Sequence, residues 1–247
     1  MINNLNGKVI IITGGNGLLG KSIIKDVNKA GGVAINLDIN HKTNIFKRRI
    51  NCDISNVNSI DSAINIILQE FGQIDGWVNN AYPRTSDWNT KFENIKIDSW
   101  KINVDLQLNT IFICCQKVLK IMKKQKFGNI VNIASIYGIV GPDFNLYQNI
   151  EITMPAAYSA IKGGVINFSK YLASYYGKNN IRVNCVSPGG IFNHQNKNFI
   201  KRYESKVPLK KMAKPDQISP AIIFLLSDSA SYITGHNLIV DGGWTII

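Results

Sequence analysis

Short apolar runs alternate with segments of helical periodicity along the whole 247-residue chain. Lys8–Thr13 is an apolar run with a glycine on each side, which is typical of a strand buried on both faces of a parallel sheet. The next segment, Leu19–Ala30, has apolar residues at helical spacing and ends at a pair of glycines. This alternation predicts strands that are each followed by a covering helix.

The rest of the chain continues the pattern. Further strands are expected at Val33–Leu37, Arg49–Asp53, Ile74–Val78, Asn129–Ala134, Ile181–Val186 and Asn237–Val240. Further helices are expected at Ser59–Phe71, Ser99–Lys124, Tyr158–Tyr176 and Pro215–Leu226. No repeat or linker interrupts them, so we expect residues 1–247 to form one domain. The predicted fold class is α/β: a single-domain, Rossmann-type, doubly wound parallel sheet flanked by helices.

Composition favours an ordered globular protein, since 45% of the residues are hydrophobic and 18% are charged. No apolar run is long enough to cross a membrane, and the first residues do not have the pattern of an export signal, so a cytoplasmic location and no membrane partner are expected. Four cysteines lack metal-ligand spacing, which predicts buried free thiols and no metal site. They are Cys52, Cys114, Cys115 and Cys185.

The formal net charge of +12 raises the possibility of an anionic partner. The basic residues are scattered over presumed helix faces, as at Lys117 and Lys120, and over residues 197–214. None of these stretches is interleaved with aromatic residues, as binding to single-stranded nucleic acid requires. We therefore expect no nucleic-acid partner. Compositional bias toward Lys, Asn and Ile explains the charge, and steering of an anionic small-molecule substrate is the alternative.

The turn between the first strand and the first helix is rich in glycine, with the sequence TGGNGLLG over residues 13–20. Glycines let the backbone approach a pyrophosphate, and a helix N-terminus offers N–H groups and a positive dipole end. Asp38 ends the second strand, where a carboxylate can bind the ribose hydroxyls and repel a 2′-phosphate, or simply cap the next turn. NAD(H) is therefore favoured over NADP(H), a preference that the basic run at 47–49 could soften. His41 is expected to be a solvated loop residue.

Tyr158 and Lys162 stand four residues apart at the start of a predicted helix, so they share one helix face. A cation beside a phenol favours phenolate, and Lys162 is expected to lower the pKa of Tyr158 toward neutrality, where it can act as acid or base. Such a pair is common and means little alone. Ser135, at the end of the fifth strand, can hydrogen-bond a substrate oxygen or cap a turn.

Taken together, these motifs resemble the classical short-chain dehydrogenase/reductase family from Lys8 to Gly243. The match rests on the glycine turn, Asp38, Asp53, Asn79-Asn80-Ala81, Ser135, Tyr158, Lys162, Asn184, Pro188-Gly189, Thr234-Gly235 and Asp241-Gly242-Gly243. The resemblance implies hydride transfer between nicotinamide C4 and a carbinol or carbonyl carbon. It also implies a homodimer or homotetramer, with contacts through the two long helices and the apolar C-terminal segment.

The resemblance implies a role for each matching residue. Tyr158 is the expected general acid/base, Lys162 the residue that orients the nicotinamide ribose, and Ser135 the group that polarises the reacting oxygen. Asp53 and Ile54 are expected at the adenine. The full set of expected cofactor contacts is Gly14, Asn16, Gly17, Leu18, Leu19, Asp38, Asp53, Ile54, Asn79, Ala81, Tyr158, Lys162, Pro188, Gly189 and Ile191. Asn79 would also brace the sheet.

Three positions depart from the family pattern. The glycine spacing is TGxxGxxG, closer to the extended branch of the superfamily, so Leu18 stands where a glycine is usual. The segment that begins at Asn79 continues into Tyr82 instead of a glycine, which makes its loop bulkier. The catalytic asparagine of the family falls on Gln107, which we include among the catalytic residues because its amide could hold the water that links Lys162 to solvent. Asn103 and Asn109 are off register.

Ser135 and Tyr158 are 23 positions apart, which is longer than usual in the family. The extra segment, 141–154, must pass near the substrate, and loops on a rigid scaffold commonly carry specificity. Its polar and aromatic side chains suit a hydroxyl-rich substrate. In this respect the chain resembles the branch of the family found in bacterial surface-glycan and flagellin-modification clusters. These side chains are Asp143, Asn145, Tyr147, Gln148 and Asn149.

Three functions remain open from the sequence. The leading one is an NAD-dependent oxidoreductase that acts on a polar carbonyl or alcohol, with a sugar or sugar-nucleotide derivative and an anionic substrate among the options. A sugar-nucleotide epimerase or dehydratase that retains NAD is favoured by the glycine spacing and disfavoured by the lack of a separate substrate domain. A non-catalytic NAD-binding interaction protein is favoured by Gln107 and Tyr82, and disfavoured by the intact Ser135, Tyr158 and Lys162.

Overall fold

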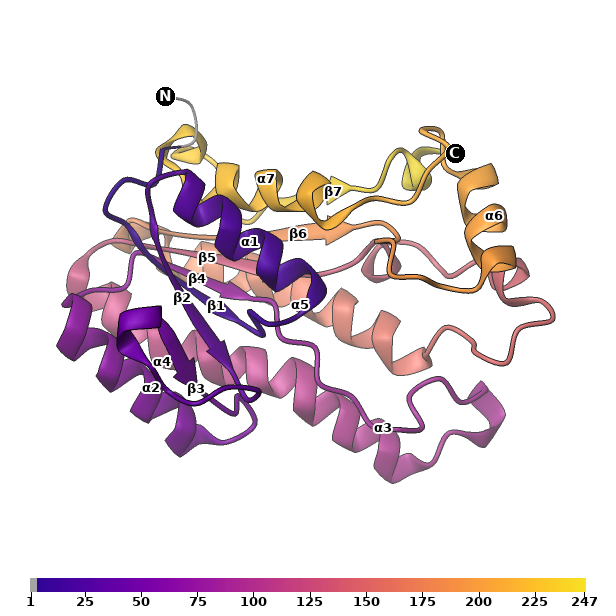
Figure 1. The fold of residues 1–247 in the computed structure, drawn as a ribbon, viewed down its shortest axis with the longest axis horizontal. Coiled ribbons are helices and arrows are strands. Elements are labelled where there is room, and N and C mark those ends of the chain that lie inside the picture. Colours follow the sequence, from indigo (N-terminus) through magenta and orange to yellow (C-terminus); the bar gives the residue numbers. More distant parts are fainter. Residues whose placement is uncertain (1–3) are drawn as a thin grey trace.

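Seven parallel strands form one sheet in the order β3-β2-β1-β4-β5-β6-β7 in the computed structural model, which describes residues 4–247 (Figure 1). The strands are β1 (Val9–Thr13), β2 (Val33–Asp38), β3 (Arg49–Asn51), β4 (Gly76–Asn79), β5 (Gly128–Ile133), β6 (Ile181–Pro188) and β7 (Asn237–Val240). The helices are α1 (Leu18–Lys29), α2 (Val57–Phe71), α3 (Ile97–Val104), α4 (Thr110–Gln125), α5 (Ala156–Tyr176), α6 (Lys197–Lys206) and α7 (Pro215–Leu226). The predicted Rossmann-type α/β fold is confirmed.

Both faces of the sheet are apolar and covered by helices, because successive strand residues point to opposite sides. In β1, Val9 and Ile11 belong to the core cluster that includes residues of α2, α4 and α5. Ile10 and Ile12 belong to the cluster that includes residues of α1 and α7. None of these four side chains is more than 4% exposed, and burial of each contributes on the order of 2 kcal/mol. Figure 1 shows α1 and α7 on one side of the sheet and α2 and α4 on the other.

The strand order reverses between β1 and β4, and in such sheets ligands bind beyond the carboxyl ends of the strands at this point. The loops that follow β1 and β4 are bonded to each other there. The Thr13 hydroxyl accepts hydrogen bonds from the backbone N–H groups of Asn80 (3.0 Å) and Ala81 (3.1 Å). The Asn80 side chain donates in turn to the carbonyls of Thr13 (3.0 Å) and Gly14 (3.1 Å). These bonds fix both walls of the crevice.

The helix predicted over Ser99–Lys124 contains a turn of π-helix at Asp105–Asn109, between α3 and α4. The Thr110 hydroxyl donates to the Leu106 carbonyl (2.7 Å), so a side chain takes part in the local bonding. Single π turns inside helices frequently occur at functional sites. Hydrophobic periodicity predicts the long helix correctly but does not predict this interruption.

The sequence interpretation missed helix α6. Asn196 caps it, since its side chain accepts from the backbone N–H groups of Asn198 and Phe199. Phe199 and Tyr203, one turn apart, are the aromatic residues that pack inward. Both signals are present in the sequence, but the surrounding lysines obscured them.

All four cysteines are buried and free. Within residues 4–247, none of the helices combines the length and the apolar character needed to cross a bilayer.

Candidate active site

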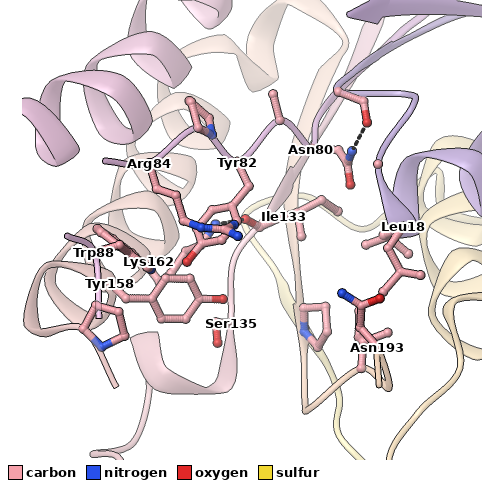
Figure 2. A pocket seen from close by; sticks show the side chains of 18 of the residues that line it. Leu18, Asn80, Tyr82, Arg84, Trp88, Ile133, Ser135, Tyr158, Lys162 and Asn193 are labelled. Carbon is pink, nitrogen blue, oxygen red and sulfur yellow. Dashed lines mark hydrogen bonds between the residues drawn. The ribbon is translucent and has the colours of Figure 1, made fainter. Parts of the chain in front are cut away.

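A cavity of about 900 Å³ lies at the carboxyl ends of the strands. It is lined by most of the site residues that the sequence predicts: Gly14, Asn16, Gly17, Leu18, Leu19, Asp38, Asp53, Ile54, Ala81, Ser135, Tyr158, Lys162, Pro188, Gly189 and Ile191. Leu18 lies on the opposite side of the pocket from Tyr158 (Figure 2). Two predicted residues, Asn79 and Gln107, do not line the cavity. The glycine turn and the candidate catalytic group therefore face the same space.

The glycine turn is built by close backbone packing. Gly14 has a φ of +65°, and a Cβ there would lie 2.7 Å from the Cα of Ala81. A Cβ at Gly20 would lie 2.3 Å from the Gly14 carbonyl oxygen. Gly17 precedes the first residue of α1 and provides no side-chain cap, so the N-terminus of this helix meets the cavity with no capping side chain. Leu18 is the first helical residue, a position that does not need glycine.

Asp38 fills the capping role considered for it and lines the cavity, while its role toward the ribose stays a prediction. Its carboxylate accepts from the backbone N–H of Asn16 (3.0 Å) and from that of Asn40 (2.9 Å), so it braces the glycine turn and caps the turn that follows β2. It is only 7% exposed and still lines the cavity. The basic run at 47–49 contributes nothing to the lining. A carboxylate without a basic neighbour in the wall favours a ribose hydroxyl over a phosphate.

Asp53 and Ile54 line the cavity beyond the end of β3. The Asp53 carboxylate is exposed and accepts from both the backbone N–H (2.9 Å) and the hydroxyl (2.7 Å) of Ser55. The adenine role predicted for these residues stays a prediction.

The expectation for His41 was wrong. Its Nδ1 lies 3.2 Å from the side-chain nitrogen of Asn16, and its Nε2 is buried without a hydrogen-bond partner among residues 4–247. Asn16 also accepts from the Asn36 side chain (2.9 Å). His41 therefore packs against the glycine turn through Asn16.

Ser135, Tyr158 and Lys162 converge at the other end of the cavity. The Ser135 side chain accepts from the backbone N–H of Tyr137 (3.2 Å), so it caps a short turn and lines the cavity as well. The Lys162 ammonium donates to the Ile133 carbonyl (2.8 Å) and lies 5.5 Å from the centre of the Tyr158 ring. Figure 2 shows the Tyr158 hydroxyl pointing toward Ser135.

The predicted effect of Lys162 on Tyr158 is wrong for the protein itself. Burial raises the pKa of Tyr158, and a hydrogen bond with Ser135 opposes that rise. Burial also lowers the pKa of Lys162 from 10.5 to about 8. Loss of hydration is therefore the largest influence on the pKa of each group and favours the neutral form of both.

Tyr82 and Trp88 form an aromatic wall around Tyr158. The three rings meet edge to face, with centroids 5.7 Å apart for Tyr82–Tyr158, 6.3 Å for Trp88–Tyr158 and 6.0 Å for Tyr82–Trp88. The Arg84 guanidinium carbon lies 5.2 Å from the centre of the Tyr82 ring. The sequence analysis identified Tyr82 only as a bulky departure from the family pattern and did not identify Trp88 or Arg84. The alternation of aromatic, basic and aromatic residues after β4 was the available signal.

The segment after Arg84 is bonded to α3 through Asn103. The Asn103 side chain accepts from the backbone N–H of Thr85 (3.1 Å) and donates to its hydroxyl (2.8 Å). The Ser99 hydroxyl donates to the Asp87 carboxylate (2.7 Å). Hydrogen bonds from Thr85 and Ser99 hold the pKa of Asp87 below its usual value. Asn103 is therefore an anchor for this loop.

The long segment 141–154 reaches the cavity as predicted, but mostly with other side chains than expected. Tyr147, Ile152, Thr153 and Met154 line the cavity. The other polar residues of the segment (Asp143, Asn145, Gln148 and Asn149) do not. Asp143 pairs with Lys206 of α6 and caps its own turn, and Gln148 donates to Asn145 (2.9 Å). Asp143 and Gln148 are thus engaged by the nearby backbone and by other side chains, so Tyr147 and Thr153 are the polar groups that the segment presents to the cavity.

Asn79 lies inside the sheet. It accepts from the Trp77 indole (2.8 Å) and donates to the Asn132 side chain (2.7 Å), and it is 3% exposed. The predicted bracing role fits these contacts, whereas the predicted place on the adenosine side does not, because the neighbouring Asn80 faces the cavity instead.

Gln107 lies in the π-helical turn and is 3% exposed. Neither atom of its amide has a hydrogen-bond partner among the described residues. Asn109, which is off register, donates to Asp105 on the surface (2.9 Å). A buried amide of this kind is expected to bind an ordered water.

Comparison with known proteins gives matches over nearly the whole chain. A family model described as Enoyl-(Acyl carrier protein) reductase matches residues 21–245. Post-translational flagellin modification protein A of Campylobacter coli is 33% identical over 253 residues, which cover 97% of this chain and 99% of that protein. The 7alpha-hydroxysteroid dehydrogenase of Bacteroides fragilis is 33% identical over 261 residues, covering 99% of this chain and 97% of the relative.

A similar solved structure is the short chain dehydrogenase from Leptospira borgpetersenii with bound NAD+. It superposes with a TM-score of 0.89 at 32% identity and covers 98% of this chain and 94% of its own.

Proposed function

This chain belongs to the short-chain dehydrogenase/reductase family, and from that premise we propose that it transfers hydride between NAD(H) and a polar carbonyl or alcohol substrate. One observation carries the proposal: a single cavity has the glycine turn and Asp38 in its wall together with Ser135, Tyr158 and Lys162. The whole chain would act as one domain. The Leptospira relative, which is described with bound NAD+, supports a nicotinamide cofactor.

The residues present fit a dinucleotide. The uncapped N-terminus of α1 suits a pyrophosphate, since backbone N–H groups and the positive end of the helix dipole meet there. Asp38 suits the adenosine ribose and would repel a 2′-phosphate, which favours NAD(H) over NADP(H). Asp53 would hold the adenine, and Pro188 and Ile191 would face the nicotinamide.

Hydride transfer needs a proton to move on and off the substrate oxygen, and nicotinamide, when bound, supplies or accepts the hydride at C4. Tyr158 would give the proton in reduction and take it in oxidation, while the Ser135 hydroxyl would stabilise the developing negative charge. Because burial raises the pKa of Tyr158, the protein itself holds this residue as a proton donor, which is the form that carbonyl reduction requires. Lys162 would hold the nicotinamide ribose.

Gln107 would complete the proton path. A water on its buried amide would connect Lys162 to solvent, as we infer from the unpartnered oxygen and nitrogen of that side chain. Glutamine has one more methylene than asparagine, and Gln107 stands in the π-helical turn at Asp105–Asn109.

A sugar or sugar-nucleotide derivative is the substrate class that we favour. The similarity to a flagellin modification protein supports it, since that relative is described as acting in protein modification. The aromatic wall of Tyr82 and Trp88, together with Asn89 and Thr153, gives the cavity both ring faces and hydrogen-bonding groups. The relative described as a hydroxysteroid dehydrogenase supports a steroid as the competing substrate class.

We also propose that the protein is a homodimer or homotetramer. Aromatic side chains form a ladder on the outer face of α4 and α5, with ring centroids 6.0 Å apart for Phe112–Phe168, 6.5 Å for Phe168–Tyr171 and 6.0 Å for Tyr171–Tyr175. Tyr171 is 61% exposed. Contiguous exposed aromatic surface commonly marks an interface between proteins.

The test is a calorimetric titration of nucleotide-free protein with NADH and with NADPH. The wild type is expected to bind NADH at least about tenfold more tightly, because a buried carboxylate would face the 2′-phosphate. Asp38→Asn should remove most of this preference, while Asp53→Asn, the matched control, should weaken both nucleotides alike.

Preference for NADPH in the wild type would contradict the role given to Asp38. Binding of neither nucleotide would contradict the enzymatic proposal and leave a non-catalytic interaction protein as the interpretation. Nucleotide that remains bound through purification and turns over without net NADH would favour the epimerase or dehydratase.

A further inference from the structure

We propose that Arg84 forms an anion-binding subsite beside the catalytic tyrosine, which takes a phosphate or carboxylate group of the substrate. The inference rests on the proposed function and narrows its substrate to an anionic carbonyl or alcohol. Arg84 lines the cavity in the segment between β4 and α3. Figure 2 shows its side chain reaching into the pocket beside Tyr82, near Tyr158 and Lys162.

Positive charge at this end of the cavity has no carboxylate to balance it. Among the residues that the structure describes, the lining contains two cationic side chains, Arg84 and Lys162, and two carboxylates, Asp38 and Asp53. Asp38 is the last residue of β2 and Asp53 follows β3, at the end assigned to adenosine. A guanidinium keeps its charge at any physiological pH, so Arg84 gives this end a permanent positive charge.

Among residues 4–247, Arg84 contacts the Tyr82 ring through its guanidinium and donates no hydrogen bond to another residue. Its five N–H groups are therefore open to a ligand. Within residues 4–247, no carboxylate forms a salt bridge with Arg84. Asp87, three positions along, is held by Ser99 instead. A guanidinium in this state can bind phosphate or carboxylate oxygens in a bidentate manner.

The segment that carries Arg84 is fixed on both sides. Tyr82 packs against Tyr158, and Thr85 is bonded to Asn103. Trp88, which is 7% exposed, packs against Tyr158 as well. Because these contacts restrict the backbone before any ligand binds, little backbone conformational entropy remains to be lost on binding.

The distances limit where the anion can sit relative to the reacting carbon. The Arg84 guanidinium carbon is 5.2 Å from the Tyr82 ring centre, which is 5.7 Å from that of Tyr158. The guanidinium therefore lies within about 11 Å of the catalytic ring. This range suits a compact substrate whose charged group is a few bonds from the carbonyl, such as a sugar phosphate or a sugar acid. The net charge of +12 would raise the encounter rate of such a substrate.

The test titrates inorganic phosphate into the protein saturated with NADH, followed by calorimetry or by the shift of ligand resonances in NMR. Saturation with NADH fills the pyrophosphate site, so added phosphate reports on the substrate end. We expect millimolar binding by the wild type, and Arg84→Gln should weaken it about 10- to 100-fold, as loss of charged hydrogen bonds implies. Lys91→Gln is the matched control, because it removes one charge from the same segment outside the cavity lining.

A second set of titrations uses glucose 6-phosphate, glucuronate and glucose as probes of the same complex. The inference requires the two anions to bind more tightly than glucose in the wild type, and Arg84→Lys to keep part of this preference. It is overturned if wild-type protein does not bind phosphate, or if Arg84→Gln and Lys91→Gln behave alike. It is also overturned if Arg84→Gln weakens NADH as much as phosphate, because Arg84 would then serve the cofactor.

Failure of the proposed function has a different signature. NADH would not bind to the wild type at all, whereas failure of this inference leaves NADH binding intact.

Discussion

Replacement of Lys162 by methionine is expected to abolish hydride transfer and yet to stabilise the fold at pH 7. Lys162 is 7% exposed, and burial lowers its pKa from 10.5 to about 8. The folded protein therefore binds this proton less tightly than the unfolded chain does, so at pH 7 the charged amine destabilises the native state. Methionine fills a similar volume and carries no charge.

The cost follows from the two pKa values. With 10.5 for the unfolded chain and about 8 for the folded protein, linkage gives a penalty of about 3 kcal/mol at pH 7 and about 2 kcal/mol at pH 9. The bond from Lys162 to the Ile133 carbonyl offsets about 1 kcal/mol of this. The methionine variant should thus be more stable by about 2 kcal/mol at pH 7, or roughly 4–8 °C in Tm, and by about 1 kcal/mol at pH 9.

The assay is urea or thermal unfolding of both proteins at one fixed concentration, between pH 7 and pH 9. Comparison of variant with wild type cancels the other titrating groups. The stability of the wild type relative to the variant should rise as the pH moves from about 8 toward 10.5, because the folded protein has by then lost the proton. Lys170→Met, an exposed lysine on the same helix, should change stability by less than about 0.5 kcal/mol.

A methionine variant that is less stable than the wild type at pH 7 would refute this reasoning. So would a gain that stays the same at pH 9.

Four other experiments test the site and the assembly. Tyr158→Phe should lower kcat by about 10²- to 10⁴-fold while NADH still binds in calorimetry, and an unchanged rate would end the acid/base assignment. Because burial raises the pKa of Tyr158, kcat/KM for alcohol oxidation should still be rising at about pH 9, and a plateau near pH 7 would contradict this. Gln107→Leu should leave stability unchanged or raise it by about 1 kcal/mol, but it should lower kcat. Gln107→Asn should retain most activity. Equal rates in the wild type and both variants would remove Gln107 from the proton path. Tyr171→Glu should shift the sedimentation coefficient toward that of a monomer, and no shift would locate the interface elsewhere.

Sequence prediction placed site residues correctly where the neighbouring backbone alone fixes their position. The glycine turn and Asp38 are local features at the ends of adjacent strands, and parallel strands bring such ends together. Tyr158 and Lys162 are fixed relative to each other by one helix turn. Asn79 and Asn80 could have been separated in the same way, since neighbouring residues at a strand end point to opposite sides.

The rest of the site depends on contacts between segments far apart in the sequence. Periodicity does not show that burial raises the pKa of Tyr158 and lowers that of Lys162. Both pKa values depend on how completely other elements cover the pair. Periodicity also does not show that the Asp143 carboxylate pairs with Lys206, 63 positions away. Arg84 was overlooked for the same reason, since nothing local marks it as a residue without an acidic partner.

The bonds from Asn103 to Thr85 have a consequence for evolution. Asn103 lies outside the cavity lining, yet it fixes the segment from which Arg84 enters the cavity. Substrate preference among relatives can therefore diverge through exchanges on α3, at positions that never touch a substrate. A comparison of orthologues and paralogues restricted to residues in the cavity wall would group together enzymes whose specificities differ. Inclusion of this remote position would separate them.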